Sequence, residues 1–166
     1  MKICIIGHAQ HGKDTCAEIL KKVFGMKFEA SSIVCARLFI FDKLKNKYGY
    51  NTIEECWIDR VNHRAEWFDL ICDYGKDDKA IVTKEILKNN DCYVGIRALE
   101  EFKASENFFN LIIWVDASKR KPLEPKSSME LTSDMADIII ENNGTLIEFE
   151  YKVMRLGYFA NLSFNH

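Results

Sequence analysis

A short apolar run followed at once by a glycine-rich loop is the feature that most constrains this fold. Residues 3–6 are Ile-Cys-Ile-Ile, and the residues from Gly7 to Lys13 carry two glycines and a lysine in phosphate-binding spacing. In such loops the glycines let backbone N–H groups curve around phosphates, and the lysine supplies a mobile positive charge. The run therefore predicts a buried parallel strand, a loop that binds a nucleoside triphosphate, and a helix whose positive end faces it.

One letter of the loop departs from the usual pattern. The position after Lys13 normally holds a Ser or Thr whose hydroxyl reaches Mg²⁺, but here it holds Asp14, with Thr15 behind it. A carboxylate beside a triphosphate repels it unless a cation offsets the charge. We therefore expect Asp14 and Thr15 to serve the metal, and His11, Gly12 and Lys13 to contact the phosphates.

Composition limits the classes of protein that this chain can belong to. With 166 residues and 48% hydrophobic content, it is long enough for one domain, 1–166. A net charge of −2 argues against a nucleic-acid partner, and no apolar stretch approaches the ~18 residues that cross a membrane. The first apolar run belongs to the predicted site rather than to a signal peptide, so we expect a cytoplasmic location.

The six cysteines are spread along the chain without a C-x-x-C pair or a histidine at ligand spacing. In a chain of this type, buried free thiols are a better interpretation than a redox or zinc site. The cysteines are Cys4, Cys16, Cys35, Cys56, Cys72 and Cys92.

The order of apolar runs and helical spacings predicts an α/β fold with a five-stranded parallel sheet flanked by helices. The expected strands are 3–6, 27–30, 92–96, 111–115 and 137–141. Helices fill an insert of about 31–90 between the second and third strands. The expected helix starts are Ser31-Ser32, Asp77, and the capping boxes Thr52 with Glu55 and Thr145 with Glu148.

The segment 118–133 carries the only prolines, Pro122 and Pro125, and its first charged residues are basic, so it is predicted to be a loop. Polar residues also end two predicted strands, Arg97 after the third and Asp116 after the fourth. Open α/β sheets bind ligands at these carboxyl ends. Asp116 is then either a carboxylate in the second shell of Mg²⁺ or a turn residue.

Phosphoryl transfer requires compensation of charge at the donor, the moving group and the acceptor, and arginines supply it. Arg97 follows a strand, where the alternative is a plain surface residue. Arg60 and Arg64 lie in the insert, where a solvated helix face explains them equally well. Trp67, one helical turn after Arg64, belongs either to the core or to a surface that stacks on a base.

Five stretches together resemble the small bacteriophage deoxynucleoside monophosphate kinases, and they span nearly the whole chain. They are Gly7–Thr15, Asn62–Phe68, Tyr93–Arg97, Ile113–Ser118 and Asp137–Thr145. The resemblance implies a P-loop kinase fold with a helical insert that binds the acceptor nucleotide and a short lid at about 118–133. It also implies Mg²⁺ as cofactor, with ATP as phosphoryl donor.

The resemblance also assigns roles to single residues. Arg97 contacts the acceptor phosphate, Arg120 acts from the lid, and Asn143-Gly144 borders the donor adenine. The acceptor-binding residues are Ser31, Arg60, Arg64, Trp67 and Arg97. The catalytic group is Lys13, Asp14, Arg97 and Arg120.

The favoured function is therefore transfer of the ATP γ-phosphoryl group to a deoxynucleoside monophosphate. One alternative is a kinase of another small phosphorylated metabolite, such as phosphomevalonate or dephospho-coenzyme A. A second is a regulatory module that binds a nucleotide without much turnover. The sequence does not indicate which base the acceptor nucleotide carries, and it is compatible with either a monomer or a homodimer.

Overall fold

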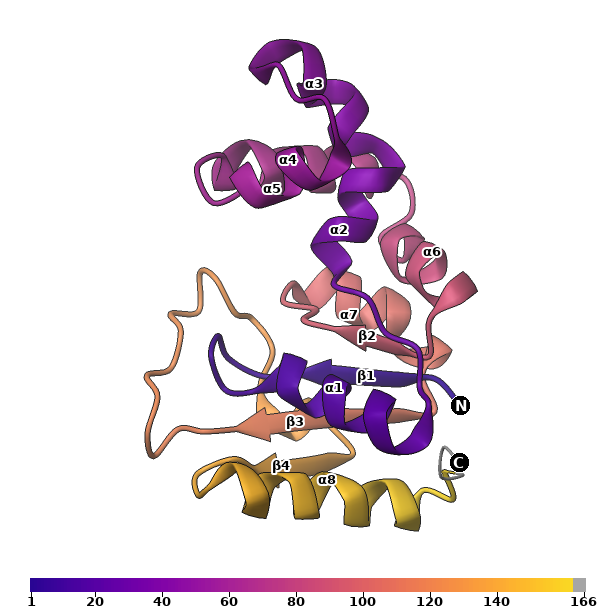
Figure 1. Cartoon of the computed structure of the whole chain (residues 1–166), viewed down its shortest axis with the longest axis vertical. Helices are drawn as coiled ribbons and strands as arrows, with labels where there is room; N and C mark the ends of the chain where they lie inside the picture. The colour runs from indigo at the N-terminus through magenta and orange to yellow at the C-terminus, as the bar shows by residue number, and fades with distance from the viewer. Residues whose placement is uncertain (163–166) are drawn as a thin grey trace.

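The computed structural model describes residues 1–162, and the last four residues of the predicted domain, 163–166, lie outside the described part. Four parallel strands form the central sheet in the order β2-β1-β3-β4 (Figure 1). They are β1 (Ile3–Ile6), β2 (Cys92–Val94), β3 (Leu111–Asp116) and β4 (Ile138–Glu141). All residues of β1 and β2 are buried, as expected for strands covered on both faces.

The predicted five-stranded sheet was wrong, because the segment 27–30 does not form a strand. Only Phe28 makes a bridge to Cys92, while the Lys27 carbonyl accepts from the N–H groups of Asp91 and Cys92. The chain then leaves the sheet at Ala30, whose carbonyl already accepts the first helical hydrogen bonds. A stretch this short has no room for a ladder.

Helices cover both faces of the sheet. Successive side chains of β1 point to opposite faces, and they show which helices lie on which side. Ile3 and Ile5 pack with helices α1 (Lys13–Phe24) and α8 (Leu146–Phe159). Cys4 and Ile6 pack on the other side, with residues of the insert and with α7 (Leu99–Ser105). The two cores are therefore separated by the sheet itself, and they lie on its two opposite faces.

The predicted insert is helical and rises from one side of the sheet, with α3, α4 and α5 farthest from it (Figure 1). Its first helix is interrupted by the π-helical turn η1, which joins α2 to α3 without a loop. The elements are α2 (Ser31–Cys35), η1 (Ala36–Ile40), α3 (Phe41–Tyr48), α4 (Ile53–Asp59), α5 (Arg64–Tyr74) and α6 (Ile81–Asn89).

Both predicted capping boxes are confirmed, at the starts of α4 and α8. The predicted serine cap of α2 is wrong, because no side chain caps that helix and the Ser32 hydroxyl accepts from Trp57 Nε1 at 2.9 Å. This bond ties α4 to α2. Asp77 does not cap α6 either, since Asp78 accepts from the Ala80 N–H.

The remaining chain completes the sheet layer. After α7 come the 3-10 turn η2 (Glu106–Phe108), strand β3, a loop, and the 3-10 turn η3 (Ser133–Met135) that begins at the end of this loop. We call residues 118–133 the 118–133 loop.

All six cysteines are free, and all but Cys72, which is exposed, are buried. Within residues 1–162, no helix has the length and apolar character needed to cross a membrane.

Replacement of Gly7 by alanine should destabilise the fold. A Cβ at this position meets the Val115 carbonyl oxygen at 2.5 Å, and Gly7 has a φ of 138°. The oxygen belongs to the backbone of β3 and cannot move aside. We expect Gly7→Ala to lower the free energy of unfolding by about 2–4 kcal/mol in urea titrations. Gly75→Ala is the control, since its φ is negative and its nearest neighbour is at 3.5 Å; an equal loss in both variants would contradict this explanation.

Candidate functional site

The glycine-rich loop, residues 7–12, joins the end of β1 to the start of α1 with an unusual backbone. Three of its residues have positive φ: Gly7 at 138°, Gln10 at 62° and Gly12 at 102°. Gln10 is one of only two described residues other than glycine with this conformation. Such backbone strain is typical of functional loops, and successive N–H groups in such conformations form concave anion-binding surfaces.

His11 fixes the loop to the ends of two strands. Its imidazole is fully buried, and Nδ1 accepts from the Ala117 N–H at 3.0 Å, just beyond β3. Its carbonyl accepts from Asn142 Nδ2 at 2.9 Å, just beyond β4. The sequence predicted a phosphate contact for His11, but the structure places its side chain in the interior. Its buried Nε2 has no hydrogen-bond partner within residues 1–162.

Lys13 is held inside the curve of the loop. Its side chain is largely buried, and Nζ donates to the His8 carbonyl at 2.6 Å. Burial first, and then the positive charge of Arg97, lower the pKa of Lys13 to about 8. Burial and a neighbouring positive charge both disfavour the charged ammonium group, and a bound anion would favour it.

The predicted metal-binding residues occupy the two sides of this loop. Asp14 is exposed in the first turn of α1, and its carboxylate has no hydrogen bond or ion pair with another described residue. Asp116 is engaged: its carboxylate accepts from Ser118 N and Oγ at 3.1 and 3.0 Å. Burial alone raises the pKa of Asp116, but the bonds from Ser118 and Asn143 hold it below its ordinary value.

No group of three or more His, Cys, Asp or Glu side chains within residues 1–162 is arranged to hold a metal ion. Mg²⁺ needs fewer protein ligands, because it keeps waters and binds one or two carboxylates together with substrate phosphates. The exposed carboxylate of Asp14 fits this mode. Asp116 fits the turn role better, since both of its oxygens already accept hydrogen bonds.

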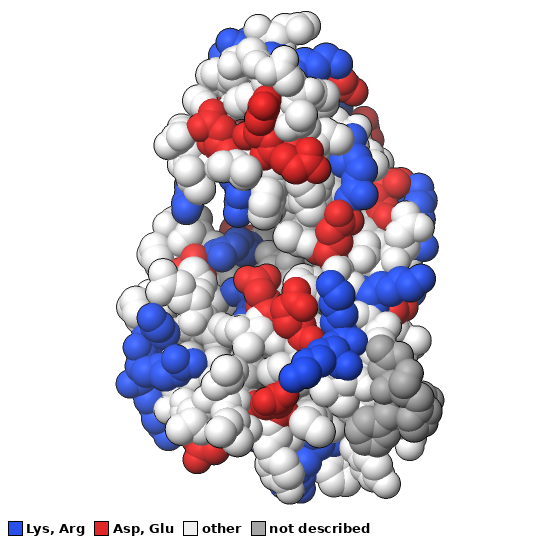
Figure 2. Space-filling view, viewed as in Figure 1, with Lys and Arg blue, Asp and Glu red and all other residues white. Residues whose placement is uncertain are grey.

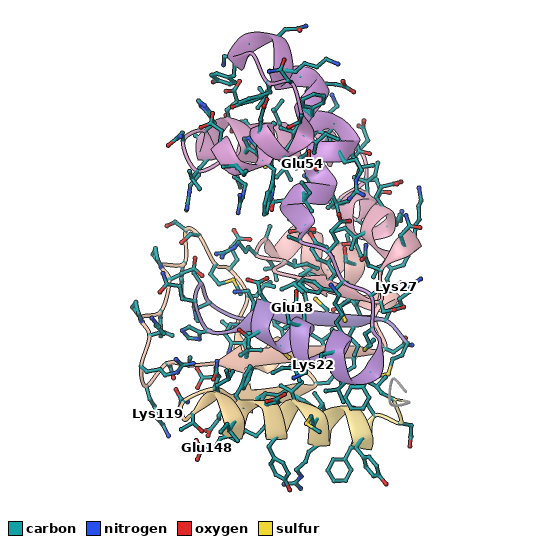
Figure 3. The ribbon with its side chains drawn as sticks, in the orientation of Figure 1. Glu18, Lys22, Lys27, Glu54, Lys119 and Glu148 are labelled. Carbon is teal, nitrogen blue, oxygen red and sulfur yellow. The ribbon has the colours of Figure 1, made fainter. Side chains whose placement is uncertain are left out.

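The 118–133 loop runs beside the glycine-rich loop and is attached at both ends. At its start, Lys119 N donates to Asn143 Oδ1 at 3.1 Å, and Arg120 Nε donates to the Asn142 carbonyl. Figure 3 labels Lys119 beside Glu148, at the start of α8. At its end, Met129 and Leu131 are buried in the core. Arg120 therefore binds the turn after β4.

That turn contains the residues predicted to border adenine. Asn143 accepts from Lys119 and donates to Asp116 Oδ2 at 3.4 Å. Gly144 lies against the capping glutamate of α8, and a Cβ at this position would meet Glu148 Oε2. The two residues thus lie at the same end of the strands as the glycine-rich loop, two strands away from it.

Glu124 connects the middle of the 118–133 loop to both the glycine-rich loop and Arg97. Its Oε2 accepts from the Ala9 N–H at 2.5 Å, and its Oε1 accepts from Arg97 Nη1 at 2.5 Å. Its own N–H donates to His8 Nδ1 at 3.1 Å. Arg97 also donates to the Ser128 carbonyl at 3.2 Å.

A cavity of about 700 Å³ lies between the insert and this part of the sheet edge. Its lining includes Ala9 of the glycine-rich loop, Ser32 of α2, Arg97 after β2 and residues of the 118–133 loop. The space-filling view shows a hollow at this level with Lys and Arg atoms inside it (Figure 2). Nitrogen-tipped side chains point from the lower side of the insert toward the 118–133 loop (Figure 3).

Arg60 and Arg64 line this cavity with Arg97, so the structure brings the three predicted arginines together. Arg60 lies over the Trp57 ring at 4.4 Å and donates to the Trp57 carbonyl. Burial first, and then the Arg64 charge, lower the pKa of Arg60. Within residues 1–162 neither Arg60 nor Arg64 has a carboxylate partner, so their positive charge is uncompensated.

Two aromatic side chains line the cavity, the predicted Trp67 and its neighbour Phe68. Trp67 is 5% exposed and also belongs to the core that faces the insert. Phe68 is 66% exposed and therefore offers the more open ring. Ser32 lines the cavity, whereas the predicted Ser31 is not one of its lining residues.

The sequence analysis missed three residues of this site, and it left His8 open between a phosphate contact and a turn position. A signal for Glu124 existed, because it is the only acidic residue from 118 to 129. No signal marked Asn142, whose role depends on a contact across more than a hundred positions. Phe68 was passed over because the sequence analysis chose its neighbour Trp67, the larger aromatic residue of the same helix.

Comparison with known proteins supports the fold alone. No family model and no curated protein matches the chain. Among the solved structures that match is one described as the crystal structure of TT1252 from Thermus thermophilus, with a TM-score of 0.53. The two sequences are 16% identical, and the match covers 98% of each chain. The chain therefore has an α/β fold with a parallel sheet similar to that of TT1252, and the resemblance to nucleotide kinases stays a prediction.

Loss of the Asn142 side chain should loosen the glycine-rich loop. The Asn142→Ala variant leaves the buried His11 carbonyl without its donor, which costs about 1–3 kcal/mol of unfolding free energy. Asn143→Ala, at the half-buried neighbouring position, removes only bonds that lie nearer to solvent and should cost less than about 1 kcal/mol. Chemical denaturation monitored by circular dichroism measures both, and equal losses would argue against a special role for Asn142.

Proposed function

We propose that the chain is a kinase that transfers the γ-phosphoryl group of ATP to the 5′-phosphate of a deoxynucleoside monophosphate. The observation that carries this proposal is the cavity in which Arg60, Arg64 and Arg97 converge beside the glycine-rich loop. Two of these arginines have no carboxylate partner within the described residues. Uncompensated positive charge in a concave site favours an anionic ligand, and about 700 Å³ suits a nucleotide.

The proposed donor site is the glycine-rich loop. Its cupped backbone and the start of α1 favour the β- and γ-phosphates, and Lys13 adds a positive charge. Mg²⁺, held by Asp14 together with the phosphates, would neutralise charge on the transferred group. Thr15, partly exposed on the same helix turn, is the second candidate for this role.

The proposed acceptor site is the cavity between the insert and Arg97. Arg60 and Arg64 bind the acceptor phosphate from the insert, while Arg97 binds it from the sheet edge, close to Lys13. This arrangement brings the attacking and transferred phosphates together and compensates the charge that develops between them. The exposed ring of Phe68 offers a surface on which a base stacks.

The 118–133 loop closes the remaining side of the site. Its residues Glu124, Ser127 and Ser128 line the cavity, and Lys121 Nζ lies 3.4 Å from Gln10 Oε1. Closure over the donor excludes water, which otherwise competes with the acceptor for the γ-phosphoryl group. Arg120 supplies further positive charge from the start of the loop.

A direct test is to incubate the chain with ATP and Mg²⁺ and to measure ADP formation with each natural monophosphate in turn. The proposal predicts ADP formation that depends on a deoxynucleoside monophosphate. Phosphomevalonate and dephospho-coenzyme A belong in the same panel, and turnover with one of these alone would select the alternative acceptor class. ATP binding without turnover on any acceptor would indicate a regulatory module.

Removal of the two central positive charges should abolish most of the transfer. We expect Lys13→Ala and Arg97→Ala each to lower kcat/KM by about 10²-fold or more, because each charge compensates the transition state. Lys84→Ala, on the outer face of α6, is the charge-matched control and should retain activity. A wild-type rate for Arg97→Ala would remove Arg97 from the site.

Truncation of Phe68 should weaken acceptor binding without slowing the chemical step. Loss of one stacking contact of about 1–3 kcal/mol raises KM for the monophosphate by roughly 5-fold to 150-fold, while kcat stays near the wild-type value. Phe108→Ala, which removes an exposed ring on η2, is the matched control. An unchanged KM in Phe68→Ala would show that the base lies elsewhere.

A further inference from the structure

The carboxylate of Glu124 is placed like a bound anion. One of its oxygens accepts from the backbone N–H of Ala9, in the glycine-rich loop, and the other accepts from Arg97. Both donors belong to the surface that the proposed function assigns to phosphate. A carboxylate and a phosphate use the same donors, namely backbone N–H groups and guanidinium forks.

Several contacts hold this carboxylate in place. The Glu124 N–H donates to His8 Nδ1, so the residue is attached to the glycine-rich loop through both its backbone and its side chain. Pro122 and Pro125 flank it and restrict the backbone. The side chain is 19% exposed, and the buried Met129 anchors the chain a few residues later.

The charge around Glu124 favours its anionic form. Burial alone raises the pKa of Glu124, but the hydrogen bonds from Arg97 and Ala9 and the charges of Arg97 and Lys13 hold it below its ordinary value. Arg97 is also the one cavity arginine of the three with a carboxylate partner within residues 1–162. The described chain thus supplies its own negative charge beside Arg97 and Lys13.

We infer that Glu124 is an internal substitute for a substrate phosphate: it occupies an anion subsite formed by the Ala9 N–H and Arg97, and a phosphate-bearing ligand displaces it. This inference rests on the proposed function and adds a regulatory element to the same site. Displacement frees Arg97 for the ligand and also releases the middle of the 118–133 loop from the glycine-rich loop. Ligand binding and loop movement are therefore coupled through one carboxylate.

The inference has a quantitative consequence. A ligand that must first displace an internal competitor binds with an apparent affinity reduced by the fraction of molecules in which the subsite is free. Weakening the competitor therefore strengthens binding of the ligand. An ordinary structural salt bridge predicts the opposite, because its removal disorders Arg97 and the loop and weakens the site.

The test is titration of inorganic phosphate and of pyrophosphate into the full chain by calorimetry, without ATP or turnover. Glu124→Gln keeps the shape but replaces the anion by a weaker acceptor, and we expect both ligands to bind about 5-fold more tightly or better. Glu124→Asp keeps the charge but shortens the reach, so that it no longer spans Ala9 and Arg97, and we expect tighter binding there too. Glu18→Gln, an equal charge change at an exposed position of α1 labelled in Figure 3, should change affinity by less than about twofold.

The charge-retaining variant separates displacement from general electrostatics. Tighter binding in Glu124→Gln but wild-type binding in Glu124→Asp would overturn the inference, because loss of one negative charge would then explain the gain. Unchanged or weaker binding in both variants would overturn it as well. Circular dichroism and thermal unfolding of each variant establish that the compared proteins are folded.

A second measurement follows the loop. Trypsin cleaves after exposed lysines, and Lys126 lies two residues beyond Glu124. Without ligand, we expect faster cleavage at Lys126 in Glu124→Gln than in the wild type or in Glu18→Gln, since the tether is weakened. Equal cleavage rates would contradict the coupling. Neither measurement uses transfer activity, so an inactive acceptor panel would reject the proposed function while leaving the phosphate titrations to decide this inference.

Discussion

The buried attachment of His11 is the interaction on which the arrangement of this site depends. Its imidazole accepts from Ala117 after β3 and its carbonyl accepts from Asn142 after β4, so one residue of the glycine-rich loop is tied to the ends of two further strands. The start of the 118–133 loop and the turn after β4 are positioned from the same place. Because a buried acceptor without its donor is costly, these bonds also make the loop geometry part of the fold's stability.

The residues around the cavity divide into a compensated half and an uncompensated half. On the sheet side, Glu124 accompanies Arg97, and buried Lys13 donates to a carbonyl. On the insert side, Arg60 and Arg64 have no such partner within residues 1–162, and the indole ring of Trp57 supports one of them. The uncompensated positive charge therefore lies mainly on the helical insert, across the cavity from the glycine-rich loop.

Sequence reasoning succeeded where structure is set by neighbouring residues. The capping boxes at Thr52 and Thr145 need only a partner three positions away, and the buried strand of residues 3–6 is a single apolar run. It failed where a choice is made at long range. The segment 27–30 follows a helix, where an α/β alternation calls for a strand, yet it makes only one bridge because the chain turns into α2. Glu124 and Asn142 escaped notice because their partners lie more than twenty or a hundred positions away.

The π-helical turn η1 makes the insert sensitive to the number of its residues more than to their identity. Val34 before the turn and Leu44 after it are both buried, in one continuous rod from Ser31 to Tyr48. A π turn holds one more residue than an α turn, and one residue rotates everything beyond it by about 100°. Length changes in this segment are thus transmitted to every later contact of α3, including the Tyr48 hydrogen bond to Glu66. The insert should therefore tolerate substitutions in residues 31–48 better than insertions or deletions there.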